Sequence, residues 1–223
     1  MPPNAPAPPP WQVYKFGGTS LATPDRIEHV ASLVSDASET RLAVVVSAMS
    51  GITDRLLALT DAAQQDDAAL DDRLHALRDN QRSAVTDLLS GAAATPVLRA
   101  LDDDIEDLAD VLQAARLMGT APETTRALVA GYGELWSARL LGGVLRDRGA
   151  DTAVCDAREV LVVTHGDLGP VVDWAATRAR FADWHGAHEA ADGIVATGFI
   201  AATPNGVPTT LGRNGSDHSA ALF

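Results

Sequence analysis

The sequence predicts an α/β fold built on a mainly parallel, open sheet. Helical patterns alternate with short apolar segments along the chain, which is typical of βαβ units. One of these segments, residues 41–47 (RLAVVVS), is apolar without alternation, as expected of a parallel strand that is covered on both faces. With 223 residues, of which 46% are hydrophobic, the chain can bury a sizeable core.

The first βαβ unit is predicted close to the amino terminus. A short strand at residues 12–16 ends at Gly17 and Gly18, and a helix over 24–37 has Thr23 as its N-cap. Apolar residues recur in this helix at a spacing of three and four, so one face is expected to be buried. The apolar strand described above completes the unit.

A helical hairpin is predicted as an insertion at about residues 66–120. After a helix that starts near Thr53, two long helical patterns cover residues 70–89 and 97–118. Between them, residues 90–96 (SGAAATP) are small and turn-forming. Part of the hairpin is strongly acidic, and we interpret its carboxylates as a solvated helix face. These are Asp102, Asp103, Asp104, Glu106, Asp107 and Asp110.

The second half of the chain continues the alternation of helix and strand. We predict a helix over 123–148, a strand over 152–156, a helix over 174–190, a strand over 193–199 and a hairpin turn at 202–207. A last helix is predicted to begin at Ser216 as its N-cap. Residues 1–10 (MPPNAPAPPP) are half proline and are predicted to be a flexible, disordered leader, which leaves residues 11–223 for the domain.

Composition limits the possible partners. A net charge of −13 opposes a nucleic-acid partner, because phosphate backbones bind clusters of Lys and Arg. No apolar run approaches the roughly 18 residues of a membrane span, so we expect a soluble protein without a membrane partner. The single cysteine, Cys155, cannot form an internal disulfide and suits a reducing cytoplasm. Lys15 is the only lysine, which makes its position informative in an acidic protein.

Four segments carry residues suited to binding anions or small polar ligands. Residues 15–20 (KFGGTS) end a strand with a lysine and two glycines, where free amides can face a nucleotide phosphate. Residues 211–217 (LGRNGSD) offer a guanidinium that can hold a carboxylate. Residues 47–53 (SAMSGIT) follow a strand at the edge where open α/β sheets bind ligands. Residues 131–137 (GYGELWS) place two glycines in a helix, at about 1 kcal/mol each, which close packing against a sheet or a ligand would offset.

Taken singly, each segment also has a purely structural explanation. The alternatives are a tight turn, a surface loop with an exposed arginine, an ordinary βα turn, and helix-to-strand packing. The six histidines predict no metal site, since His185, His188 and Glu189 read H-x-x-H-E, which matches neither H-E-x-x-H nor H-x-x-E-H. A serine nucleophile is not predicted either, because G-x-S-x-G is missing.

Taken together and in this order, the four segments resemble those of aspartate kinases of the amino acid kinase family. The likeness extends from Val13 to Phe223 and rests on KFGGTS, VVSAMSGIT, GELWSARLL and TTLGRNGSD. It implies a three-layer αβα sandwich and ATP-dependent phosphorylation of the side-chain carboxylate of L-aspartate, the first step of lysine, threonine and methionine biosynthesis. ATP with Mg²⁺ would be a co-substrate, no cofactor would be tightly bound, and the full-length parent would be a homo-oligomer.

The resemblance also implies roles for individual residues. The residues that contact ATP would be Lys15, Phe16, Gly17, Gly18, Gly215 and Ser216. The residues that contact aspartate would be Ser47, Thr53, Glu134, Arg213 and Ser216. Within this set, Glu134 would pair with the substrate ammonium and Arg213 with its α-carboxylate. Lys15 and Asp217 would be the catalytic residues, because Lys15 would neutralise the transferred phosphoryl group and Asp217 would orient Lys15 or the phosphates. His218 stands where many family members have tyrosine.

The implied reaction explains why no catalytic histidine is needed. An aspartate side chain is ionised at neutral pH, so the reaction requires alignment and charge neutralisation rather than a general base. Family members continue with a nucleotide-binding half, regulatory ACT domains or a fused homoserine dehydrogenase, so we expect a truncated, amino-terminal part of the kinase domain. Two alternatives stay open: a non-catalytic aspartate-binding or regulatory fragment, and a kinase for another small amino acid. Glu134 opposes N-acetylated substrates, which would leave its carboxylate unpaired.

Overall fold

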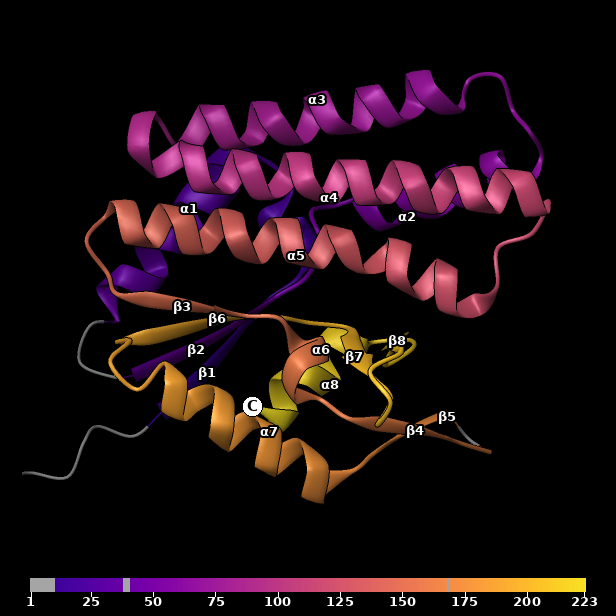
Figure 1. Ribbon diagram of the computed structural model, residues 1–223. Helices are drawn as coiled ribbons and strands as arrows, with labels where there is room; N and C mark the ends of the chain where they lie inside the picture. Colours follow the sequence, from indigo (N-terminus) through magenta and orange to yellow (C-terminus); the bar gives the residue numbers. More distant parts are fainter. Residues whose placement is uncertain (1–10, 38–40, 168) are drawn as a thin grey trace, which may run out of the picture.

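The computed structural model describes residues 11–37, 41–167 and 169–223, which form three layers around a central sheet (Figure 1). In spatial order the strands of this sheet are β1 (Trp11–Phe16), β2 (Arg41–Val46), β6 (Gly193–Thr197) and β3 (Thr152–Cys155). Every pairing between neighbours is parallel. The predicted α/β fold with an open, mainly parallel sheet is therefore confirmed. The leader predicted at residues 1–10 lies outside the described residues.

Helices cover both faces of the sheet. One side carries α1 (Pro24–Asp36), α2 (Ile52–Gln64), α3 (Leu70–Leu88), α4 (Gly91–Met118) and α5 (Glu123–Asp147) (Figure 1). The other side carries α7 (Trp174–Ala187) and α8 (Gly215–Leu222). Because both faces are covered, β6 and all of β2 except Arg41 are buried, which is the environment that the uninterrupted apolar run predicts.

Smaller elements complete the fold. They are a 3₁₀ helix η1 (Gly18–Leu21), a short helix α6 (Ala157–Val160), a hairpin of β4 (Val163–Gly166) with β5 (Gly169–Val172), and a hairpin of β7 (Ile200–Ala202) with β8 (Pro208–Thr210). The second hairpin encloses the turn predicted at 202–207. The first hairpin was not predicted, because its strands are only four residues long and Val163 is the only buried residue in them, which leaves no alternating apolar pattern.

Local sequence explains where α1 begins and where α5 ends. Thr23 has an extended backbone and its hydroxyl accepts a hydrogen bond from the amide of Arg26, 3.4 Å away, as predicted for the N-cap. After the last turn of α5, Gly149 adopts φ +90° and its amide donates a hydrogen bond to the carbonyl of Arg146 at 2.9 Å. A glycine in this left-handed conformation is a common helix terminator.

The prediction of a turn at residues 90–96 is wrong. Helix α4 begins at Gly91 and contains Pro96 in its second turn, so only Leu89 and Ser90 separate it from α3. Three consecutive alanines favour the helix at this point, and the Thr95 hydroxyl donates to the Gly91 carbonyl at 3.0 Å. The helical pair predicted at about 66–120 is present, and it lies outside α5 (Figure 1). Its description as an insertion stays a prediction.

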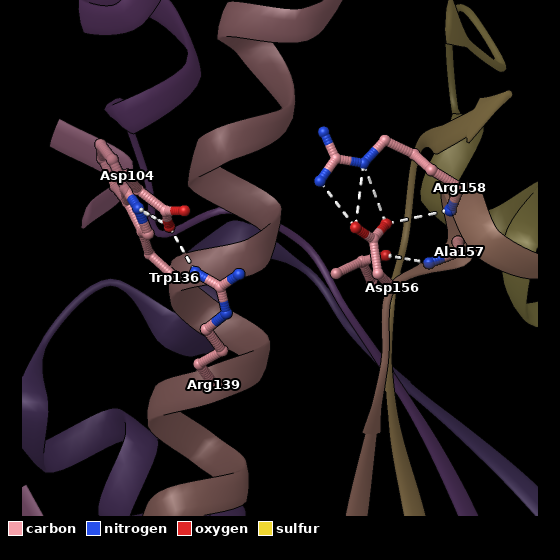
Figure 2. A network of polar contacts seen from close by, with 7 residues as sticks. Asp104, Trp136, Arg139, Asp156, Ala157 and Arg158 are labelled. Carbon is pink, nitrogen blue, oxygen red and sulfur yellow. Dashed lines mark hydrogen bonds and ion pairs between the residues drawn. The ribbon is translucent and has the colours of Figure 1, made fainter. Parts of the chain in front are cut away.

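Asp104 corrects the interpretation of the acidic stretch as a solvated face. This side chain on α4 is buried, with 9% of its surface exposed, and it accepts a hydrogen bond from Trp136 Nε1 at 2.9 Å. It also forms an ion pair with Arg139 of α5 (Figure 2). Burial raises the pKa of Asp104, while Arg139 and Trp136 oppose that shift. Asp104 therefore ties the outer helical pair to the helix that covers the sheet.

Three predicted boundaries are also corrected. β6 ends at Thr197 rather than Phe199, because Phe199 has φ +66° and turns the chain out of the sheet. Helix α7 ends at Ala187 rather than at residue 190. Helix α8 begins at Gly215, with Asn214 rather than Ser216 at the N-cap. No helix in the part of the chain that the structure describes combines the length and apolar character needed to cross a membrane.

Candidate active site

A cavity of about 270 Å³ lies at the carboxyl ends of β1, β2 and β6, beside the first turn of α8. Ligands of open α/β sheets bind at this edge. The cavity is lined by Lys15, Ser47, Ala48, Thr53, Glu134, Phe199, Gly212, Asn214, Gly215, Ser216 and Asp217. The four segments singled out in the sequence each contribute to this lining, although the first and the last lie at opposite ends of the chain.

Lys15 provides the cation of the site. It is the penultimate residue of β1, and its ammonium lies 2.8 Å from a carboxylate oxygen of Asp217 in the first turn of α8. The two side chains are 28% and 61% exposed, so the ion pair faces solvent at the cavity. A phosphate that enters here can therefore approach the ammonium, while Asp217 limits the orientations open to the lysine side chain.

Gly18 holds the first segment against the second. A Cβ atom at this position would lie 2.7 Å from the backbone oxygen of Ala48, so only glycine allows the contact. The amide of Ser50 also donates to the Gly18 carbonyl at 3.2 Å. The turn after β1 and the turn after β2 are thereby fixed to each other. Neither Gly17, Gly18 nor Phe16 lines the cavity itself.

Glu134 is the buried carboxyl group of the site. It lies in the middle of α5, has 3% of its surface exposed and lines the cavity. Burial raises the pKa of Glu134 to about 8, against the opposing effects of a backbone hydrogen bond at Ala48 and the charge of Lys15. Its Oε2 atom has no hydrogen-bond partner within the described structure, so this acceptor is available to a ligand.

The neighbouring glycines explain how Glu134 reaches the cavity. A Cβ atom at Gly133 would lie 2.9 Å from the Ala48 Cβ, and one at Gly131 would lie 3.3 Å from a methyl group of Ile200. Close packing thus offsets the low helix propensity of both glycines. The packing also brings α5 close to the cavity, while a role of this segment in binding a ligand stays a prediction.

Two more glycines bring α8 against the end of β6. A Cβ atom at Gly198 would lie 2.7 Å from that of Ser216, and one at Gly215 would lie 2.8 Å from the ring of Phe199. The Ser47 hydroxyl donates to the Ser216 hydroxyl at 2.9 Å. Ser216 therefore lies at the cavity, inside the helix rather than at the N-cap position predicted for it.

Phe199 is a site residue that the sequence analysis missed. Its φ of +66° is unusual for a bulky residue, and two hydrogen bonds hold it there. The Ser219 hydroxyl accepts from its amide at 3.0 Å, and its carbonyl accepts from the Leu211 amide at 2.7 Å. Backbone strain of this kind concentrates at functional sites. Its position at the carboxyl end of the predicted strand 193–199 was the available signal.

Ala48, Gly212 and Asn214 also line the cavity without having been predicted. They lie within predicted segments but carry no charged group, so residue chemistry alone did not select them. Conversely, Arg213 lies between two lining residues, yet its own side chain is exposed and does not line the cavity. Its predicted role toward a carboxylate stays a prediction.

A second cavity of about 410 Å³ adjoins the first. The two share Thr53, Phe199 and Gly212, and the larger one extends toward the amino-terminal turns of α5 and both small hairpins. Within the described ranges, no group of three or more His, Cys, Asp or Glu side chains is arranged to hold a metal ion. The first cavity therefore presents the Lys15 ammonium with its partner Asp217, the buried carboxyl group of Glu134 and several hydroxyls.

Comparison with known proteins gives consistent matches. Residues 10–223 match the family model described as "Amino acid kinase family". The chloroplastic bifunctional aspartokinase/homoserine dehydrogenase 1 of Arabidopsis thaliana is 41% identical over 214 residues, which are 96% of this chain and 23% of that protein. Lysine-sensitive aspartokinase 3 of Escherichia coli strain K12 is 35% identical over 95% of this chain and 45% of its own length.

A solved structure agrees with these matches. The crystal structure of E. coli aspartokinase III in complex with aspartate and ADP has a TM-score of 0.81 and 30% identity, over 94% of this chain and 45% of that chain. The same enzyme in complex with lysine and aspartate has a TM-score of 0.79. The chain thus spans less than half the length of these relatives.

Proposed function

Because the chain belongs to the amino acid kinase family, we propose that it acts as an aspartate kinase and transfers the γ-phosphoryl group of ATP to the side-chain carboxylate of L-aspartate. The observation that carries the proposal is the meeting of four distant segments at one cavity, with the Lys15–Asp217 ion pair beside the buried Glu134. The E. coli relative was crystallised with aspartate and ADP, which are the substrate and the nucleotide product of this reaction.

In the proposed reaction, aspartate supplies the nucleophile without help. Its ionised side-chain carboxylate attacks the γ-phosphorus, the bond to the β-phosphate oxygen breaks, and ADP and 4-phospho-L-aspartate result. Lys15 neutralises charge on the transferred group, and Asp217 orients Lys15, from which it is 2.8 Å away. The proposed contacts to ATP are Lys15, Phe16, Gly17, Gly18, Gly215 and Ser216, and Mg²⁺ bound with the nucleotide would neutralise further phosphate charge.

The proposed substrate contacts explain the choice of an amino acid. Glu134 pairs with the ammonium, Arg213 with the α-carboxylate, and Ser47, Thr53 and Ser216 offer hydroxyls. Three observations support this arrangement: Glu134 Oε2 lacks a partner among the described residues, Thr53 lines the cavity, and Ser47 contacts Ser216. An N-acetylated substrate would leave Glu134 without a cation, at a cost of roughly 1–3 kcal/mol or more.

The surroundings of the reaction are part of the proposal. We propose a cytoplasmic location, which the single, buried and free Cys155 suits. A homo-oligomeric state of the full-length parent is proposed from the family resemblance. L-Aspartate and ATP are the proposed small-molecule partners.

Hydroxylamine trapping of the acyl phosphate tests the proposal. The purified chain is given ATP and Mg²⁺ with L-aspartate, L-glutamate or N-acetyl-L-glutamate, and the K15M variant serves as the control. We expect hydroxamate with aspartate alone and none with K15M. Reaction with only a comparison substrate would contradict the aspartate assignment. Aspartate binding without any hydroxamate would favour a non-catalytic aspartate-binding fragment.

A further inference from the structure

Three properties of Glu134 together favour a protonated side chain in the empty site. It is 3% exposed, it lines the cavity, and its Oε2 atom has no partner within the described residues. The other buried side-chain atom without a partner in the described structure is Ser137 Oγ, one turn further along α5. Burying an ionised carboxylate without a partner costs several kcal/mol, so such a group tends to keep its proton.

The groups around Glu134 do not supply the missing cation. Lys15 on β1 is the basic group that faces it, and the Lys15 ammonium is held by Asp217 on α8 at 2.8 Å. Arg213, in the turn before α8, does not line the cavity. The remaining lining residues come from the turns after β2 and β6, from α2, from the turn before α8 and from the first turn of α8, and none of them is ionisable. They are Ser47, Ala48, Thr53, Phe199, Gly212, Asn214, Gly215 and Ser216.

We propose that Glu134 carries a proton in the substrate-free site and releases this proton to solvent when the ammonium group of the substrate binds. The inference rests on the proposed function, in which the substrate is an amino acid with a free ammonium. The balance is one neutral carboxylic acid and one ammonium before binding, and one carboxylate–ammonium pair and one released proton afterwards. Below pH 8, Glu134 is therefore neutral in the empty site and paired with the ammonium in the occupied one.

This exchange predicts that the apparent affinity for the amino acid rises with pH. Burial raises the pKa of Glu134 to about 8, so most of these groups hold the proton at pH 7. The apparent affinity for the amino acid should rise about tenfold per pH unit below pH 8, and level off above it. Binding should release most of one proton per site at pH 7, and much less at pH 9.

Infrared spectroscopy tests the first half of the inference without any substrate. The wild-type chain at pH 6 should show a protonated carboxylic-acid band that disappears on titration to pH 9 and is absent from E134Q. The matched control is E123Q, which makes the same chemical change at an exposed position of the same helix. E123Q should keep the band. Absence of the band from the wild type at pH 6 would overturn the inference, whatever the chain binds.

Calorimetry tests the second half. L-Aspartate is titrated into the chain at pH 7 in two buffers of different ionisation enthalpy, and the difference in heat gives the number of protons released. Release of most of one proton per site by wild type and E123Q supports the exchange. Binding with no proton release overturns it. If the infrared band is present but L-aspartate gives no binding heat, the proposed function has failed while the protonated resting state stands.

Discussion

Glu134 should make the stability of the protein depend on pH. The folded-state pKa of Glu134 is raised by burial to about 8, from an ordinary value of 4.5. Between these values the folded state keeps a proton that the unfolded state has lost, so the free energy of unfolding falls as pH rises, by up to about 1.4 kcal/mol per pH unit. The contribution is complete at pH 4.5 and is lost once the pH passes 8.

The E134Q variant isolates this contribution. Its amide keeps nearly the same shape but cannot ionise, so its free energy of unfolding should exceed that of wild type by an amount that grows from pH 5 to pH 8. Urea denaturation at several pH values measures the difference. A difference that is the same at pH 5 and pH 8 would show that Glu134 does not titrate in this range.

Glycines 133 and 186 offer a matched test of packing. Alanine at position 133 would place its Cβ 2.9 Å from Ala48 Cβ and 3.1 Å from Ile52, so G133A should destabilise by about 1–3 kcal/mol despite its better helix propensity. No heavy atom lies within 4 Å of the corresponding Cβ at Gly186, in α7. G186A should therefore stabilise by about 0.5 kcal/mol. Thermal unfolding of both variants decides; equal effects would contradict the packing argument.

At the scale of residues, the sequence predicted charged groups better than neutral ones. Lys15, Glu134 and Asp217 were identified because their charges stand out in otherwise apolar or glycine-rich segments, and all three line the cavity. Phe199 was missed because its contribution comes from a left-handed backbone, which no side-chain property of phenylalanine suggests. Arg213 was predicted to contact a carboxylate, but its side chain does not line the cavity. The orientation of this side chain depends on the backbone of the turn before α8, which its charge does not predict.

At the scale of elements, helix α5 links the cavity to the outer helical pair. Glu134 faces the cavity, while Trp136 and Arg139 bind Asp104 of α4. D104A should leave the indole nitrogen and the guanidinium without their acceptor, and should destabilise by about 2 kcal/mol. The control is D103A, an exposed neighbour on the same helix, which should change stability by at most about 0.5 kcal/mol. Equal effects in urea denaturation would show that the contact contributes nothing.

Element boundaries were harder to predict than element types. The pattern of strands and long helices followed from hydrophobic periodicity, but α4 starts six residues before its predicted position because helix-favouring alanines outweigh Pro96. Ser216 has the side chain of an N-cap, yet Asn214 takes that position in a left-handed conformation, which asparagine tolerates. Tertiary contact with Gly198 decides the matter, because it places Ser216 inside the first turn.

At the scale of the whole molecule, the net charge is −13, and the only lysine, Lys15, lines the proposed active-site cavity. K15M should therefore abolish phosphoryl transfer while the fold is kept, because Lys15 is partly exposed and packs no core. Its circular dichroism spectrum and melting temperature should match those of wild type within a few degrees. Full activity in K15M would remove this residue from the proposed mechanism.

The most direct test of the central claim is the binding of L-aspartate and N-acetyl-L-aspartate to the chain, measured by isothermal titration calorimetry near pH 8. The two ligands carry the same carboxylates and differ in the ammonium group that Glu134 is proposed to recognise. We predict binding of L-aspartate, at least tenfold weaker binding of the N-acetyl compound, and loss of this preference in E134Q. Equal affinities for the two ligands, or a preference that survives in E134Q, would contradict the account.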